Sequence, residues 1–89
     1  MATILIVDDS ATDRKLASLL IERSLDCTLL QADCAEAALE QLEQVEPDLV
    51  LTDLQMPGLT GLDLVGRMRD DWPNVPVILM TARGSEEIA

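Results

Sequence analysis

The chain has 89 residues, of which 48% are apolar, enough for one modest globular core and for no more than one domain. Its 17 acidic and 6 basic side chains give a formal net charge of −11, which repels nucleic-acid phosphates, and its single aromatic residue provides no stacking platform for bases. We therefore expect no direct binding of DNA or RNA by this chain.

Strand-type and helix-type segments alternate along the chain, as in a parallel sheet built from βα units. The first strand, residues 3–7, is almost wholly apolar, which is typical of a strand covered on both faces. Ser10 is the expected N-cap of a helix over residues 11–24, with Asp13 as its capping-box partner. The helical spacing in that segment is carried by Leu16, Leu19, Leu20 and Arg23.

A second strand is expected over residues 27–32. Asp33 and Glu36 repeat the capping pattern ahead of a second helix, and Pro47 prevents that helix from continuing. The helical stripe consists of Ala35, Ala38, Leu39, Leu42 and Val45.

The third strand is expected over residues 48–52, followed directly by Asp53 and by a Pro57-Gly58 turn. Thr60 and Asp63 then open a third helix, which ends at 72–74. The apolar face of this helix is predicted to be Leu62, Val65 and Met68.

Pro76 leads into a fourth strand over residues 77–80, because proline is tolerated at the first position of a strand. Thr81 follows this strand. Residues 85–87 resemble the first turn of a fourth helix, with acidic side chains at its positive end.

Carboxylates follow two of these strands, Asp8 and Asp9 after the first and Asp53 after the third. Ligands of an open parallel sheet bind beyond the carboxyl ends of its strands, where the strand order reverses. If the first and third strands are neighbours, the three carboxylates converge. Two carboxylates ~4 Å apart repel by roughly 4 kcal/mol at an effective dielectric near 20, so the group needs a cation, and oxygen-only ligands favour Mg²⁺.

An aspartate beside such a metal can act as a nucleophile and form an aspartyl phosphate, and Asp53 is the best placed to do so. Taken singly, each position also has a purely structural interpretation. Asp8 and Asp9 can end a strand and cap a helix, Asp53 can be a turn residue, and Thr81 an ordinary strand end. Their joint occurrence at strand ends favours a site.

Three separately placed motifs occur in a specific order. They are Ile6-Val7-Asp8-Asp9-Ser10, Asp53-Leu54-Gln55-Met56-Pro57-Gly58-Leu59-Thr60-Gly61 and Pro76-Val77-Ile78-Leu79-Met80-Thr81-Ala82. Together they resemble the receiver domain of two-component response regulators, the CheY-like superfamily, from Thr3 to the last residue. The resemblance implies an α/β, flavodoxin-like parallel sheet in the order 2-1-3-4 with helices on both faces, and a single receiver domain over residues 1–89.

By the same resemblance, a sensor histidine kinase would phosphorylate Asp53, and the protein would act as a signalling switch. Asp9 would bind Mg²⁺ directly, Asp8 would act on it through water, Gln55 would lend its backbone carbonyl, and the hydroxyl of Thr81 would carry the switch. Such a receiver is not an independent enzyme and catalyses only its own phosphotransfer and dephosphorylation. An aspartate-based phosphatase would need a second acidic residue two positions after the nucleophile. Position 55 is Gln, which argues against that class of enzyme.

The chain also departs from the family, which continues with a fifth strand ending in a lysine and with a fifth helix. The only lysine here, Lys15, falls in the first predicted helix, so we expect a receiver truncated before strand five. Without the positive charge of the family's lysine, the negative charge of the site and of a phosphoryl group would be less well neutralised. Two alternatives therefore remain beside the phosphoacceptor, namely a non-phosphorylated interaction module and a fragment of a longer regulator. An exposed fourth-strand edge over residues 77–80 would also invite homodimerisation.

No apolar run approaches the ~20 residues that cross a bilayer, and the N-terminus lacks the basic and apolar segments of a secretory signal, so we expect a cytoplasmic protein. Cys27 and Cys34 form no C-x-x-C pair and the chain has no histidine, so they are expected to be reduced structural thiols. The absence of histidine also excludes a phosphohistidine carrier and a Ser-His or Cys-His nucleophile.

Overall fold

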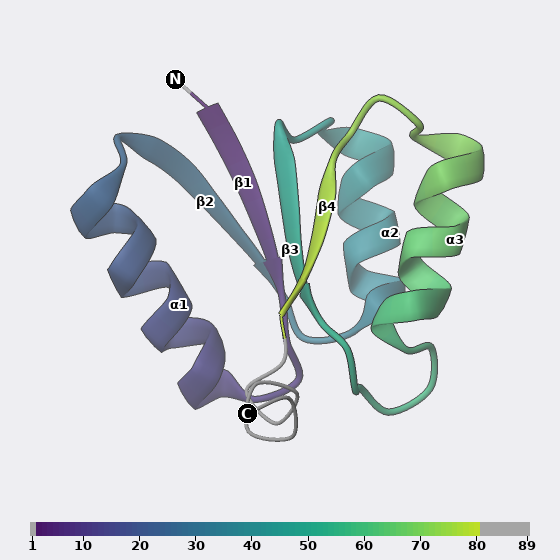
Figure 1. The fold of residues 1–89 in the computed structure, drawn as a ribbon, viewed down its shortest axis with the longest axis horizontal. Coiled ribbons are helices and arrows are strands. Elements are labelled where there is room, and N and C mark those ends of the chain that lie inside the picture. The colour runs from purple at the N-terminus through teal and green to yellow at the C-terminus, as the bar shows by residue number, and fades with distance from the viewer. Residues whose placement is uncertain (1, 81–89) are drawn as a thin grey trace, which may run out of the picture.

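The computed structural model describes residues 2–80, which form a parallel sheet in the order β2-β1-β3-β4. Helix α1 covers one face of the sheet, and α2 and α3 cover the other (Figure 1). The strands are β1 (Ala2–Val7), β2 (Cys27–Ala32), β3 (Leu49–Asp53) and β4 (Val77–Met80), and the helices are α1 (Ala11–Ser24), α2 (Ala35–Gln44) and α3 (Gly61–Asp71). The architecture confirms the predicted flavodoxin-like fold class and strand order.

The central strand β1 is the most deeply buried element, because it pairs in parallel with β2 on one side and β3 on the other. From Ile4 to Val7 no residue of it is more than 4% exposed. One core cluster fills the layer between the sheet and the pair α2 and α3. Its members include Leu5, Val7 and Val50 from the strands, Ala35, Ala38 and Leu42 from α2, and Leu64 and Met68 from α3.

Side-chain caps define where two helices begin. The Ser10 hydroxyl accepts a hydrogen bond from the Asp13 amide, and α1 spans the predicted residues 11–24. At α3 the Thr60 hydroxyl accepts from the Asp63 amide while the Asp63 carboxylate accepts from the Thr60 amide, so the two residues predicted to open this helix form a capping box.

The predicted cap of α2 is wrong by one residue. Cys34, not Asp33, is the N-cap, and its Sγ accepts from the Ala37 amide at 3.4 Å. Because Cys34 still has an extended backbone, both residues 33 and 34 are used to turn the chain out of β2 before the helix begins. The geometry of the connection therefore overrides the stronger intrinsic capping preference of aspartate.

The predicted apolar face of α3 is also wrong in part. Leu62 is 61% exposed, whereas Gly61, Leu64 and Met68 are buried. The helix begins at Gly61, which packs closely against the backbone at the end of β3, and Leu62, the next residue, faces outward. At its other end α3 stops at Trp72, whose amide donates to the Met68 carbonyl and whose side chain packs on the core.

Helix α1 packs against β1 and β2, and its leucines do not form a buried face. Leu16, Leu19 and Leu20 are 54%, 47% and 64% exposed, and the buried residue of the helix is Ser18. Within residues 2–80, β4 pairs with β3 alone, so homodimerisation through its other edge stays a prediction.

None of the helices in residues 2–80 has the length and hydropathy needed to span a membrane. Both cysteines are free thiols and are partly buried. The predicted fourth helix at 85–87 and Thr81 lie outside the described residues.

Candidate metal centre

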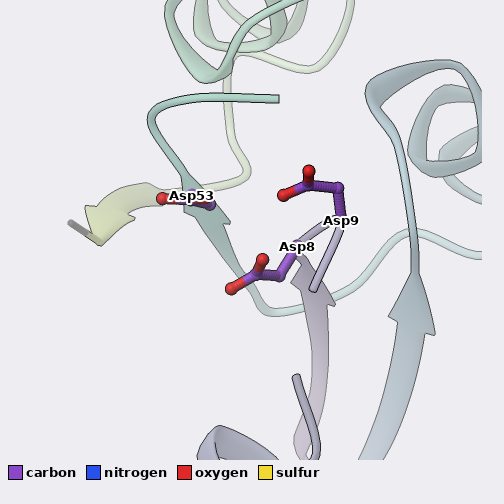
Figure 2. Close-up of side chains that lie close together, drawn as sticks. All are labelled: Asp8, Asp9 and Asp53. Carbon is purple, nitrogen blue, oxygen red and sulfur yellow. The ribbon is translucent and has the colours of Figure 1, made fainter. Parts of the chain in front are cut away.

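Three aspartates meet at the carboxyl end of the sheet. Asp8 and Asp9 lie just beyond β1 and Asp53 lies at the end of β3, with their side chains grouped around one space (Figure 2). One carboxylate oxygen from each can be chosen so that all three atoms lie within 4.8 Å of one another. Residues separated by 44 positions in the chain thus form one acidic cluster.

Strand register produces this convergence. Val7 of β1 is paired with Thr52 of β3, so the next residues along both strands, Asp8 and Asp53, reach the same edge of the sheet. Asp53 itself is the last residue of β3, one position beyond the predicted strand end, because it pairs with Met80 of β4. Its backbone is therefore held by the sheet and not by a free loop.

Burial decreases steeply across the cluster. Asp8 is only 7% exposed, Asp53 is partly buried and Asp9 is exposed. Burial raises the pKa of Asp8 above its ordinary value, a hydrogen bond from the Ser10 amide (2.9 Å) opposes that rise, and the charges of Asp53, Asp13 and Asp9 raise the pKa further. The three ionised carboxylates therefore repel one another, and a bound cation would reduce that repulsion.

An open cleft surrounds the three carboxylates. Its walls are Asp8, Asp9, Ser10, Asp13, Ala17, Asp53, Gln55, Met56, Pro57 and Met80. Gln55 is thus at the cleft, as the proposed carbonyl ligand must be, whereas no lysine among residues 2–80 contributes to these walls. The exposed Lys15 lies on α1. A donor set made only of oxygen atoms suits Mg²⁺, which prefers carboxylates and retained water.

Gly61 holds the loop after Asp53 close to the strand. Its amide donates to the Leu54 carbonyl at 2.9 Å. A Cβ at this position would overlap the Asp53 carbonyl oxygen and lie 3.0 Å from the Leu54 Cα. Glycine is therefore required where α3 meets the end of β3.

Sequence reasoning missed one residue beside the cluster, Arg14 of α1. Its Nη1 donates a 2.7 Å hydrogen bond to the main-chain carbonyl of Asp8. No motif signals such a side-chain to main-chain contact between elements. The available sign was only the position of a basic residue near the start of the helix that follows the acidic pair.

The family model of the response regulator receiver domain matches residues 4–89. The chain belongs to the response regulator receiver family. It is 35% identical over 88 residues to the phosphate regulon transcriptional regulatory protein PhoB of Pseudomonas aeruginosa, covering 96% of this chain and 38% of that protein. It is 33% identical over 87 residues to the nitrate/nitrite response regulator NarL of Escherichia coli K12, covering 97% of this chain and 40% of NarL.

Solved receiver structures share the fold. The response regulator TrrA of Thermotoga maritima, crystallised in complex with Mg²⁺-BeF, superposes with a TM-score of 0.87 at 33% identity, covering 92% of this receiver and 70% of TrrA. The receiver therefore spans about two fifths of the length of PhoB and NarL and 70% of the TrrA chain.

Proposed function

We propose that this receiver accepts a phosphoryl group on Asp53 from a sensor histidine kinase, with Mg²⁺ held by the acidic cluster, and that the modified form acts as a signalling switch. The observation that carries the proposal is the convergence of Asp8, Asp9 and Asp53 at one end of the sheet. Family membership supports it, because two-component receivers take their phosphoryl group from such kinases.

The roles of the individual residues follow the family pattern. Asp9 binds the metal directly, Asp8 acts on it through water, Asp53 contributes a carboxylate oxygen, and Gln55 contributes its backbone carbonyl. When bound, Mg²⁺ neutralises negative charge on the transferring phosphoryl group. Thr81 supplies the hydroxyl that meets the phosphate.

The transfer is a displacement at phosphorus. A carboxylate oxygen of Asp53 forms a bond to the phosphorus of the kinase phosphohistidine while the phosphorus–nitrogen bond breaks, and the imidazole leaves and takes a proton from solvent. Asp53 stands at the end of a paired strand and lines the cleft, which favours a fixed position for its carboxylate there. Modification would then shift the population of conformations that partners recognise.

A second candidate function is a receiver-like interaction module that is never phosphorylated, and a fragment of a longer regulator is a separate alternative. The observation that favours the interaction module is the lack of a lysine in the cleft walls that residues 2–80 form, since a positive charge there would stabilise the transferring phosphoryl group. Homodimerisation through the free edge of β4 is a separate proposal that is compatible with either function.

The family membership also leads us to infer a cytoplasmic location. We propose no contact of this chain with nucleic acid, because of its net charge of −11. PhoB is named as a transcriptional regulatory protein, and this chain covers only 38% of its length.

The test is phosphorylation by a small donor. We expect the purified chain, incubated with Mg²⁺ and acetyl phosphate, to gain the mass of one phosphoryl group. Asp53→Asn should abolish the gain, and Asp70→Asn, the same change at an exposed carboxylate outside the cleft walls, should retain it. Modification of the Asp53→Asn variant would contradict the assignment, and a folded, metal-binding parent without any adduct would favour the interaction module.

A further inference from the structure

Arg14 ties the acidic cluster to the neighbouring strand. Its Nη1 donates to the Asp8 main-chain carbonyl at 2.7 Å, and its Nε donates to Oε1 of Gln31 in β2 at 3.1 Å. We propose that Arg14 is a positioning residue for the metal centre, which holds the peptide between Asp8 and Asp9 so that both carboxylates face one cation. This inference rests on the proposed metal-dependent function.

The peptide that Arg14 holds lies where the sheet stops supporting the chain. The Asp8 amide makes a last ladder bond to the Ala32 carbonyl of β2 at 3.0 Å, and β1 ends at Val7. The Asp8 carbonyl accepts from Arg14 instead of from a strand. Because that carbonyl belongs to the peptide leading to Asp9, a rotation of the peptide would carry the exposed Asp9 side chain away from Asp8 and Asp53.

Arg14 is itself held in place. It is half-buried, and its own main-chain carbonyl accepts from the hydroxyl of the buried Ser18 at 2.8 Å. Its partner Gln31 is fixed through its main chain, since the Gln31 carbonyl accepts from Nε2 of Gln41 in α2 at 2.7 Å. A planar guanidinium presents several donors in a fixed arrangement, so one side chain can meet the Asp8 carbonyl and the Gln31 amide oxygen together.

The charge and the geometry of Arg14 predict opposite effects on metal affinity. A positive charge near three carboxylates repels a divalent cation, so removing the charge alone would tighten metal binding. Losing the hydrogen bond to the Asp8 carbonyl would loosen the two carboxylates and weaken binding. The sign of the change therefore separates a positioning role from a charge effect, and a role confined to fold stability would leave the affinity of the folded protein unchanged.

The experiment measures Mn²⁺ binding, as a probe for the Mg²⁺ site, from the loss of the free-ion electron paramagnetic resonance signal. We expect Arg14→Gln to weaken Mn²⁺ binding about tenfold, the range found for residues that orient metal ligands, with an unchanged far-UV circular dichroism spectrum. Unchanged or tighter binding by the folded variant would overturn the proposal.

Two further variants keep the test decisive. Arg23→Gln removes the same charge from the last turn of the same helix, and it should leave Mn²⁺ affinity unchanged or slightly tighter. Weakening equal to that of Arg14→Gln would contradict a specific role for Arg14. Gln31→Ala keeps the charge of Arg14 but removes its orienting acceptor, so a smaller loss of affinity is expected. If Arg14→Gln does not fold, an unchanged affinity of Gln31→Ala overturns the proposal.

The outcomes also distinguish this inference from the proposed function. A folded parent that does not bind Mn²⁺ would reject the metal-dependent function, and the role of Arg14 would fall with it. A parent that binds Mn²⁺ with the same affinity as folded Arg14→Gln would reject the role of Arg14 alone.

Discussion

Leu64 and Asp8 are both buried beside the same sheet, one in the layer under α2 and α3 and the other at the carboxyl end of β1. In the layer, apolar side chains from β1, β3, α2 and α3 pack on each other and no charged residue is part of the cluster. At the carboxyl end, three carboxylates share one space, and burial and neighbouring charges raise the pKa of Asp8. The layer stabilises the fold, whereas the ionised acidic end lowers the stability of the metal-free protein.

The boundary between the two regions is sharp. In β1, Val7 is fully buried in the core cluster, while Asp8 and Asp9 belong to the cleft. In β3, Thr52 is fully buried and Asp53 faces the cleft. The same strands therefore supply both regions. In each strand, one residue packs in the core and the next residue belongs to the acidic cleft.

The largest expected effect lies in the packed layer. Leu64→Ala should lower the free energy of unfolding by about 2–5 kcal/mol, because it removes a fully buried side chain and leaves a cavity. Leu62→Ala, two residues earlier and 61% exposed, should change it by less than about 0.5 kcal/mol. Urea unfolding followed by far-UV circular dichroism measures both, and equal losses would show that α3 is oriented differently from this structure.

A substitution at the junction of the two regions should affect both. Gly61→Ala should cost about 1–3 kcal/mol, because its methyl group would displace the Asp53 carbonyl, and it should also slow formation of the phosphoryl adduct in the folded fraction. Gly66→Ala is the matched control, since a Cβ at this helical position meets no atom within 4 Å.

We expect the control to gain roughly 0.5–1 kcal/mol from helix propensity and to leave the adduct rate unchanged. Urea unfolding and the time course of intact mass are the measurements. A stable, fully active Gly61→Ala variant would refute the close approach of α3 to Asp53.

The smallest expected effect is a gain in stability at the acidic end. The folded pKa of Asp8 is raised above the ordinary 3.8, so the native state holds the proton more tightly, and stability falls as pH rises from 3.8 through the folded pKa. Asp8→Asn should remove this loss and make the metal-free protein slightly more stable at pH 7, with the advantage vanishing below about pH 3.8.

Thermal unfolding at several pH values tests this expectation, with Asp70→Asn as the control at an exposed carboxylate. Added Mg²⁺ should narrow the difference, because it stabilises the parent more than a variant that has lost one acidic group of the site. A less stable Asp8→Asn variant at neutral pH would mean that the surroundings of Asp8 stabilise its ionised carboxylate even without metal.

The sequence predicts the framework well because its signals are local and strong. Apolar runs ending in polar residues indicate the strands, and Ser10 and Thr60 mark helix starts through their own hydrogen bonds. The order of the strands followed from the resemblance to receivers, and that order brings the ends of β1 and β3 together.

Features that depend on contacts between elements were not predictable in the same way. Leucines at 62 and 64 both satisfy a helical pattern, and only the way α3 packs on the sheet shows that Leu64 is buried and Leu62 exposed. The start of α2 at Ala35 depends on the turn that leaves β2. Arg14 reaches a carbonyl six residues earlier, a contact that hydrophobic periodicity does not encode. The roles of all the proposed site residues, Gln55 and Thr81 included, stay predictions.

The position of Trp72 determines what optical spectroscopy will detect in this receiver. The chain has no tyrosine or phenylalanine, so its intrinsic fluorescence arises from one indole. That indole packs on the core at the end of α3, whereas the acidic cleft lies at the end where α3 begins. Emission from Trp72 is therefore expected to change when the packed layer unfolds and to stay nearly constant during a metal titration. The fluorescence of this receiver then reports folding independently of metal binding.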